Sequence, residues 1–244
     1  MAVGGVFGIG HGFHGATICT FSFRAVVSTP RQLYPIAVAT GYSSTRQSER
    51  RQTTIDEAIR HARDIIAEQG AGAVSISEIA RRMQMRPPSL YKYFPSLNAL
   101  YDRLFEVGNL ELSTFVDAAR ADREPGLDRL LEQSRAIIRW SVTEPGLAAL
   151  LFWRPVPGFE PSEAAFAPAR AIVDQARKDL ATAVAGGELG PGADSEDALR
   201  LLTSVVSGIG SQQMSNEPGA TYESGAYTRL LDDALQMWVR HYSP

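Results

Sequence analysis

The chain of 244 residues has one cysteine, Cys19, and no long uninterrupted apolar run. A single cysteine excludes an intramolecular disulfide and a cysteine-rich zinc or iron–sulfur centre, and it is typical of a reducing compartment. Because a helix that crosses a bilayer needs about 20 consecutive apolar residues, we expect no membrane partner and a cytoplasmic protein.

Acidic residues are absent from the first 45 residues, which carry two arginines. Residues 46–103 carry ten basic and seven acidic residues, whereas residues 104–244 carry twelve basic and twenty acidic residues. The net charge of −3 therefore combines a basic first part with an acidic body. A polyanionic partner for residues 46–103 would explain this asymmetry, and an ordinary solvated surface would explain it equally well.

Residues 1–45 also lack a sustained helical period, and we interpret them as a flexible, disordered leader. The segment Gly10-His11-Gly12-Phe13-His14-Gly15 matches the dinucleotide fingerprint G-x-G-x-x-G. The first acidic residue, however, is Glu49, so the ribose-binding carboxylate expected about 20 residues downstream is missing. His11 and His14 have no third ligand nearby. We therefore expect no cofactor and no metal.

From Arg46 onward, apolar residues recur at helical intervals between breaks rich in proline and glycine. Capping-box spacings at Thr54 and at Ser75 predict the starts of two helices, over about 54–69 and 76–83. A third helix is expected from Pro87 to Phe94 and a fourth from Leu97, after a break at Pro95 and a cap at Ser96. The buried side of the fourth helix is predicted to hold Leu97, Leu100, Leu104, Val107, Leu110 and Phe115.

The rest of the chain reads as further helices, so the predicted fold class is all-α. These helices are expected over Leu127–Thr143, about Pro168–Ala185, Ser195–Met214 and Tyr222–Tyr242. The predicted domains are the leader (1–45), a three-helix unit with a helix-turn-helix (46–103) and a larger helical body (104–244).

Two short helices joined by three residues, on a preceding amphipathic helix, have the layout of a helix-turn-helix that enters the DNA major groove. The N-terminus of the second helix is expected to offer unpaired amides to phosphate. Positive charge around this helix would come from Arg81, Arg82, Arg86 and Lys92.

The segment SISEIARRMQMRPPSLYKYF, residues 75–94, resembles the DNA-binding segment of the tetracycline-repressor (TetR) family. The resemblance covers about Thr53 to Leu104. The chain departs from the family at Gln84, where glycine is frequent, and at Leu97, where lysine is frequent. The resemblance implies a homodimeric transcriptional regulator, associated with the nucleoid, that reads a pseudo-palindromic operator in double-stranded DNA. It favours a repressor released by a small-molecule effector.

The same resemblance implies roles for residues of the helix-turn-helix. Arg86 is the first candidate for a guanine contact because its planar fork matches two acceptors on one base. For Tyr91 a place in the core is an alternative. The residues expected to face base edges are Arg86, Pro87, Pro88, Ser89 and Lys92, and those expected at the DNA backbone are Ser75, Tyr91 and Tyr93. Of the first group, Lys92 is expected to contact phosphate rather than a base. A minor-groove arm is expected from Arg46, Arg50 and Arg51, with a solvated linker as the alternative.

The acidic body resembles the ligand-binding and dimerisation half of the same family. An apolar effector pocket is predicted at five aromatic residues, for which a place in an ordinary core is the alternative: Trp140, Phe152, Trp153, Phe159 and Phe166. A dimer interface is predicted on the last two long helices, with a core inside one chain as the alternative. Its residues are Ser204, Ser207, Gly208 with Gly210, Ser211, Leu231, Leu235 and Trp238.

Catalytic motifs are missing: the sequence has no G-x-S-x-G, no phosphate-binding glycine loop ending in Lys-Ser or Lys-Thr, and no H-E-x-x-H. We therefore do not expect an enzyme. Two alternatives to the effector-controlled regulator stay open. They are a DNA-binding regulator without an effector, and an all-α protein-interaction module with a vestigial helix-turn-helix.

Overall fold

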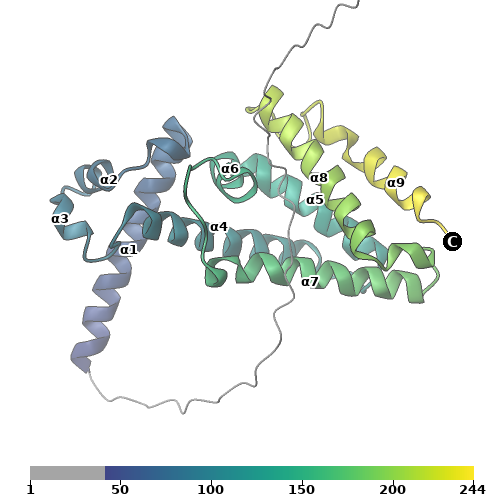
Figure 1. Ribbon diagram of the computed structural model, residues 1–244, viewed down its shortest axis with the longest axis horizontal. Helices are drawn as coiled ribbons and strands as arrows, with labels where there is room; N and C mark the ends of the chain where they lie inside the picture. The colour runs from purple at the N-terminus through teal and green to yellow at the C-terminus, as the bar shows by residue number, and fades with distance from the viewer. Residues whose placement is uncertain (1–41) are drawn as a thin grey trace, which may run out of the picture. The chain divides into compact units, whose positions relative to one another are not determined.

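The computed structural model describes residues 42–244, which are all helical apart from turns and loops (Figure 1). The glycine-rich segment at residues 10–15, with His11 and His14, lies outside the described residues. The α-helices are α1 (Tyr42–Gln69), α2 (Ile76–Arg82), α3 (Pro87–Leu90), α4 (Leu97–Ala119), α5 (Leu127–Thr143), α6 (Pro145–Trp153), α7 (Glu163–Ala185), α8 (Glu196–Asn216) and α9 (Leu231–His241). Single 3₁₀ turns occur at Ala71–Ala73, Pro191–Ala193 and Thr228–Leu230.

Helix α1 begins at Tyr42, so the predicted start at Thr54 is wrong. The hydroxyl of Thr54 donates to the carbonyl of Arg50 at 3.0 Å, and Thr53 donates to Glu49 at 2.9 Å. Threonine can bond the carbonyl four residues earlier inside a helix, so capping-box spacing alone did not mark a helix end. The arginines predicted to form an arm before the helix therefore lie within it.

The predicted caps of α2 and α4 are confirmed. The Ser75 hydroxyl accepts a hydrogen bond from the amide of Glu78 at 3.2 Å, and the Ser96 hydroxyl accepts one from Ala99 at 3.1 Å. Each serine thus satisfies an amide that has no partner inside its helix. Helix α3 is shorter than predicted, because regular helix ends at Leu90 and turns continue to Tyr93.

In the body, α5 has the predicted bounds, α8 agrees with the prediction within two residues at each end, and three other elements differ more. Pro145 and Gly146, interpreted as a break, begin a separate helix, α6, since proline fits a first helical turn. Helix α7 begins at Glu163, capped by Ser162, and holds Pro168 inside it. Helix α9 begins at Leu231 instead of Tyr222.

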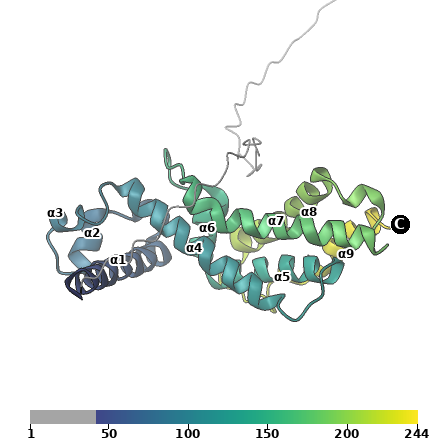
Figure 2. The ribbon, with the colours of Figure 1, turned by 90° about the horizontal axis from the view of Figure 1, so that it is seen from below.

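A continuous core joins the helix-turn-helix to the body. Helix α4 crosses the predicted boundary between residues 103 and 104, and the core that includes Leu90 and Leu104 extends to Leu147 and Ile172. Helix α7 lies along α4 (Figure 2). A second core lies among α5, α7, α8 and α9. Within residues 42–244 no helix is both long enough and apolar enough to span a bilayer.

The buried side of α4 differs in part from the prediction. Leu100 and Leu104 are fully buried, but Leu110 and Phe115 are exposed. Because α7 packs along α4, the second half of α4 instead buries Asn109, Leu112 and Val116. Neither exposed residue was distinguishable from core by spacing.

Candidate nucleic-acid interface

Residues 86–93, called the recognition segment below, are held from inside by apolar side chains. Leu90 and Ile79 are completely buried, and Phe94 is buried in the same core, which includes residues of α1. Leu90 faces inward, whereas Arg86, Pro88 and Lys92 of the recognition segment are exposed. The helix-turn-helix therefore has a cationic outer side. Such a side is needed if these residues are to bind DNA.

The other predicted DNA contacts are exposed to different degrees. Tyr91 is 51% exposed, so its alternative assignment to the core is wrong. Pro87, Ser89 and Tyr93 are half-buried. Ser75 is also half-buried, and its hydroxyl caps α2, which leaves its hydrogen free to donate. The DNA-binding roles of these residues stay predictions.

The turn between α2 and α3 forms a Schellman motif with glutamine in the position that usually holds glycine. The amide of Met85 donates to the carbonyl of Ala80 at 2.8 Å, and that of Gln84 donates to Arg81 at 3.1 Å. Gln84 has φ = 55°. This left-handed conformation favours glycine, which has no Cβ to crowd the backbone. Gln84, which replaces the glycine frequent in the family, is therefore a strained turn residue.

The expectation that α3 offers unpaired amides to phosphate is wrong. Its first two residues, Pro87 and Pro88, have no N–H, and the amide of Ser89 donates to the carbonyl of Arg86 at 2.9 Å. Side chains, and not the start of this helix, must therefore make any phosphate contacts of the segment.

Two of the four predicted cations on the helix-turn-helix are paired with acids. Both guanidinium nitrogens of Arg81 that face Glu78 lie 2.7 Å from its carboxylate. Arg82 donates to Glu78 at 2.9 Å and to Glu68 at 2.6 and 3.1 Å. These hydrogen bonds from Arg81 and Arg82 lower the pKa of Glu78 to about 2. Of the four predicted cations, Arg81 and Arg82 are therefore neutralised by Glu78 and Glu68. Arg86 and Lys92 supply the positive charge that is not paired with an acid among the described residues.

Arg51 contacts the recognition segment, which the sequence did not predict. Its Nη1 donates to the carbonyl oxygen of Lys92 at 3.2 Å, and its guanidinium carbon lies 5.2 Å from the centre of the Tyr93 ring. Arg46 and Arg50 are exposed on the same helix, α1. None of the three is in a linker, and a minor-groove arm that precedes the first helix is excluded for them.

Arg63 connects the helix-turn-helix to the body. From α1 it donates to Glu111 of α4 at 2.5 Å and to Glu144, between α5 and α6, at 3.0 Å. Helix α6 also packs on α1, where Gly146 meets Ile66. The two parts are therefore joined by charge and by close packing.

Four of the five aromatic residues of the predicted effector pocket pack in or against the core. Phe159 is buried, and the centre of its ring lies 5.5 Å from that of Tyr101. Phe166 lies edge-on to Phe105, with 4.8 Å between the ring centres. Trp140 is also buried in this core, Phe152 packs against it, and Trp153 is 41% exposed. In this conformation, four of the five residues belong to a packed core.

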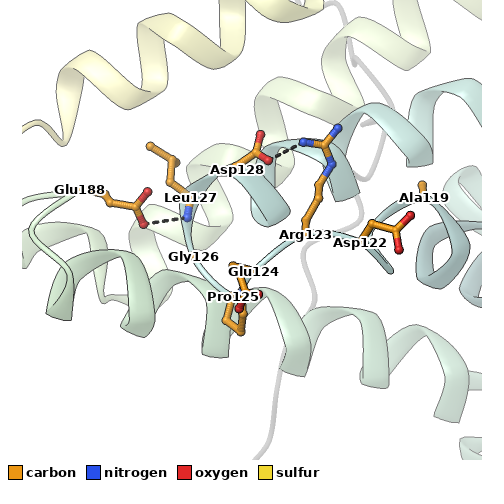
Figure 3. Close-up of a pocket in the computed structure, with 9 residues that line it drawn as sticks. All are labelled: Ala119, Asp122, Arg123, Glu124, Pro125, Gly126, Leu127, Asp128 and Glu188. Carbon is orange, nitrogen blue, oxygen red and sulfur yellow. Dashed lines mark hydrogen bonds and ion pairs between the residues drawn. The ribbon is translucent and has the colours of Figure 1, made fainter.

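A surface hollow of about 550 Å³ lies instead at the α4–α5 corner (Figure 3). Its residues are mainly polar or acidic: Ala119, Asp122, Arg123, Glu124, Pro125, Gly126, Leu127, Asp128 and Glu188. Arg123 pairs with Asp128, and Glu188 accepts a hydrogen bond from the amide of Leu127 at 3.1 Å. This hollow shares no residue with the predicted aromatic pocket.

The predicted dimer interface is corrected in part. Leu231, Leu235 and Trp238 face the core of their own chain, and the indole N–H of Trp238 donates to the carbonyl of Ala198 at 3.1 Å. Those three residues are therefore unavailable to a partner. Gly210 is buried too, whereas Ser204, Ser207 and Gly208 are exposed and Ser211 is half-buried.

Apolar residues that were not predicted from the sequence are also exposed on α8 and at the start and middle of α9. Leu201 shares a side of α8 with Ser204 and Gly208, at spacings of three and seven residues. Leu230, the residue before α9, is 45% exposed. Met237, within α9, is 69% exposed. A signal existed in the sequence, since positions 201, 204 and 208 share one side of a helix.

The described residues thus form an all-helical protein with an N-terminal helix-turn-helix and a larger helical body. The chain belongs to the tetR family. A model of bacterial regulatory proteins of the tetR family matches residues 58–104, and a model of the tetracyclin repressor-like C-terminal domain matches residues 130–235, together more than half of the chain. The resemblance inferred from residues 75–94 is confirmed.

Among curated proteins, the HTH-type transcriptional regulator Rv1816 of Mycobacterium tuberculosis is 30% identical over 127 residues. The match covers 51% of this chain and 54% of the relative, so the chain spans about half the length of the curated relatives it matches. These relatives are transcriptional regulators and not enzymes.

Solved structures share the fold. A protein of unknown function from Rhodococcus sp. RHA1 superposes with a TM-score of 0.65 at 20% identity, over 78% of this chain and 95% of that one. The transcriptional regulator FadR from Bacillus subtilis, in complex with stearoyl-CoA, gives 0.63 at 15% identity, over 75% and 97%.

Proposed function

We propose that this chain is a homodimeric, sequence-specific DNA-binding transcriptional regulator. Each recognition segment reads one half-site of a pseudo-palindromic operator. The observation that carries the proposal is the outer side of that segment, where Arg86, Tyr91 and Lys92 are exposed around a helical turn anchored from within by Leu90. Membership of a family of regulators supports the same conclusion.

In this proposal, Arg86 binds O6 and N7 of a guanine in the major groove, and Lys92 and Tyr91 bind phosphate. Pro87, Pro88 and Ser89 face base edges. The two prolines contact the bases through their apolar rings, and Ser89 contacts them through its hydroxyl. The hydroxyl groups of Ser75 and Tyr93 donate hydrogen bonds to the phosphate backbone of the DNA. Arg46 and Arg50 add charge along α1, where residues 46–53 are exposed.

The proposed dimer pairs α8 and α9 with the same helices of a second copy. Leu201, Ser204 and Gly208 are exposed along one side of α8, and Leu230 and Met237 are exposed on α9. A Cβ added at Gly208 meets no atom within 4 Å. This open position allows another helix to approach closely.

The regulator is proposed to be a repressor that a small molecule releases from DNA. An effector would favour a geometry of the body in which the two recognition segments no longer match successive major grooves. The Arg63 contacts and the packing of Gly146 on Ile66 give the body a connection to α1. The fold shared with FadR, which was solved with stearoyl-CoA, supports a ligand-binding body.

A second candidate is a regulator without a small-molecule effector. The observation that favours it is the packed aromatic cluster around Phe105, Phe159 and Phe166, where an apolar effector pocket was predicted. An effector that enters there has to displace packed side chains.

The test of DNA binding is a selection of random duplexes with the full chain at about 50 and 200 mM salt. We expect a two-fold symmetric sequence that is bound more tightly than a shuffled duplex at both salt concentrations. Equal affinity for the two duplexes would refute the proposal. Adding stearoyl-CoA and other acyl-CoA thioesters, with a small-molecule panel, to the selected complex then separates the two candidates: release supports an effector, and unchanged affinity throughout favours the second candidate.

A further inference from the structure

The recognition segment has little regular structure of its own. Helix α3 is a single turn of four residues, and the chain continues as turns through Lys92 and Tyr93. One turn of helix is not stable in isolation, because its nucleation cost exceeds the gain of one or two hydrogen bonds. Leu90 and Phe94 hold the segment from the inside. At its outer end the amide of Tyr93 donates to the carbonyl of Leu90 at 2.9 Å and Tyr93 packs on the core, whereas Lys92 is exposed. A contact from outside the segment would restrict the position of this end further.

Arg51 of α1 makes such a contact. Its Nη1 donates to the carbonyl oxygen of Lys92 at 3.2 Å, and its guanidinium lies over the Tyr93 ring at 5.2 Å. A cation is favoured at the carbonyl end of a helical turn, and a guanidinium over an aromatic face adds a cation–π attraction. Both contacts act on the two residues that end the recognition segment.

Arg51 is in this position because α1 continues as a helix beyond the helix-turn-helix core. Residues 46–53 are exposed, whereas the core contacts of α1 begin at Ile55 and Ala58. The continuous helix holds Arg51 at a fixed place opposite Lys92. A guanidinium that is already bonded to a carbonyl and stacked on a ring is poorly placed to act as a DNA-binding arm.

We propose that Arg51 is a positioning residue for DNA recognition, which orients Lys92 and Tyr93 through its contacts with the end of the recognition segment. This inference rests on the proposed function and assigns to Arg51 a role different from that of Arg46 and Arg50. Loss of Arg51 lowers the fraction of molecules whose recognition segment is in the binding geometry. Binding to the preferred sequence then weakens, while the charge-driven binding to any duplex is retained.

The experiment compares the full wild-type chain with Arg51→Ala and with Arg50→Ala, the matched loss of one exposed charge on the same helix. Binding is measured on the selected duplex and on a shuffled duplex over a range of salt concentrations. For Arg51→Ala we expect about tenfold weaker binding to the selected duplex. We expect binding to the shuffled duplex, and the slope of log K against log salt, to change no more than for Arg50→Ala.

A double-mutant cycle separates positioning from direct contact. Tyr93→Leu removes the ring from the other side of the contact, and Tyr93→Phe keeps the ring but removes the hydroxyl. Arg51→Ala should have a smaller effect in Tyr93→Leu, where only the hydrogen bond to the Lys92 carbonyl is left to lose, than in wild type, and should retain its full effect in Tyr93→Phe. Tyr93→Leu also tests the contact if Arg51→Ala does not fold.

Three outcomes overturn the inference. One is an equal loss on both duplexes for Arg51→Ala with a salt slope lower by about 0.9, which indicates a phosphate contact. Another is additivity of Arg51→Ala and Tyr93→Leu. The third is a wild-type chain that prefers no duplex, which is recognised before any variant is made and refutes the proposed function itself.

Discussion

Gly146 packs directly against Ile66, so that a Cβ at position 146 would lie 2.6 Å from Cγ2 of Ile66. This contact joins α6 to α1, where a β-branched side chain has little freedom to rotate. We expect Gly146→Ala to destabilise the chain by about 1–3 kcal/mol, measured by urea unfolding.

The control is Gly72→Ala, because a Cβ there meets no atom within 4 Å. Combining Gly146→Ala with Ile66→Ala removes the clash and should cost less than the sum of the two single changes. Unchanged stability of Gly146→Ala would show that α6 can move away from α1 at no cost.

Gln84→Gly should stabilise the helix-turn-helix. Gln84 holds the left-handed position of the Schellman motif at φ = 55°, which glycine adopts without crowding by a Cβ. The expected gain is about 0.5–1 kcal/mol in the free energy of unfolding. Gln84→Ala retains a Cβ and should show no gain. Thermal unfolding of the three proteins decides the matter, and equal gains from glycine and alanine would contradict the strain argument.

The Glu78 carboxylate should make the stability of the chain depend on acidity. Hydrogen bonds from Arg81 and Arg82 lower the pKa of Glu78 from 4.5 to about 2. Because the pKa is lowered in the folded state, the contribution to stability is fully present above pH 4.5 and is lost as the pH falls toward 2. Glu78→Gln should therefore be less stable than wild type at pH 7, with a difference that shrinks between about pH 4.5 and 2.

Unfolding curves across this pH range test the stability difference, and an NMR titration of the Glu78 carboxyl tests its pKa. Arg81→Ala combined with Arg82→Ala should return that pKa toward 4.5. A Glu78 pKa that does not respond to loss of both arginines would refute the assignment.

Arg86 and Lys92 should differ in how they affect DNA binding. Both are exposed on the recognition segment. Arg86→Ala is expected to weaken binding to the preferred duplex by about 1–3 kcal/mol and binding to a shuffled duplex much less, as for a bidentate base contact. Lys92→Ala should weaken both equally and lower the salt slope by about one, as for a phosphate contact. Fluorescence anisotropy on the two duplexes measures both effects. An equal loss on both duplexes for Arg86→Ala would reassign Arg86 to phosphate.

Met237 should be needed for the proposed dimer. Its side chain is 69% exposed on α9, at a spacing of seven residues from exposed Leu230. Met237→Asp places a carboxylate in an apolar interface and should raise the dimer dissociation constant about tenfold or more. Gln236→Asp, at an exposed neighbouring position that points about 100° away, is the control. Sedimentation velocity distinguishes them, and a Met237→Asp dimer as stable as wild type would place the interface elsewhere.

Local signals in the sequence were sufficient for several features of the fold and the candidate site. The serine caps at Ser75 and Ser96 involve residues only three positions apart, so the pattern specifies the contact. Leu90 is apolar and has polar Ser89 and Lys92 as near neighbours, which favours an inward position for its side chain. The missing amides at Pro87 and Pro88 were also readable from the sequence, because proline has no N–H in any fold.

Other features were not predictable because they depend on contacts between distant segments. Thr53 and Thr54 fit a helix start as well as a helix interior, and the continuation of α1 to Tyr42 settled which applies. Trp238 fits an interface as well as a core, and its hydrogen bond to Ala198, 40 residues away, fixes it inside one chain. In such cases the residue type permits both environments, and the packing of the helices selects one.

By itself, the sequence determined that this protein is helical, that it carries a helix-turn-helix and to which family it belongs, since each of these depends on residue type and short spacing. The tertiary structure decided which cations remain unneutralised on the recognition surface, which apolar residues of α8 and α9 face outward, and that Arg51 reaches Lys92 from α1. Arg81 and Arg82 meet Glu78 within four residues, but the pairing of Arg82 with Glu68 spans 14 positions and the contact of Arg51 with the Lys92 carbonyl spans 41. No short-range pattern encodes such distances, because the approach of two segments is set by how all the helices bury their apolar sides together.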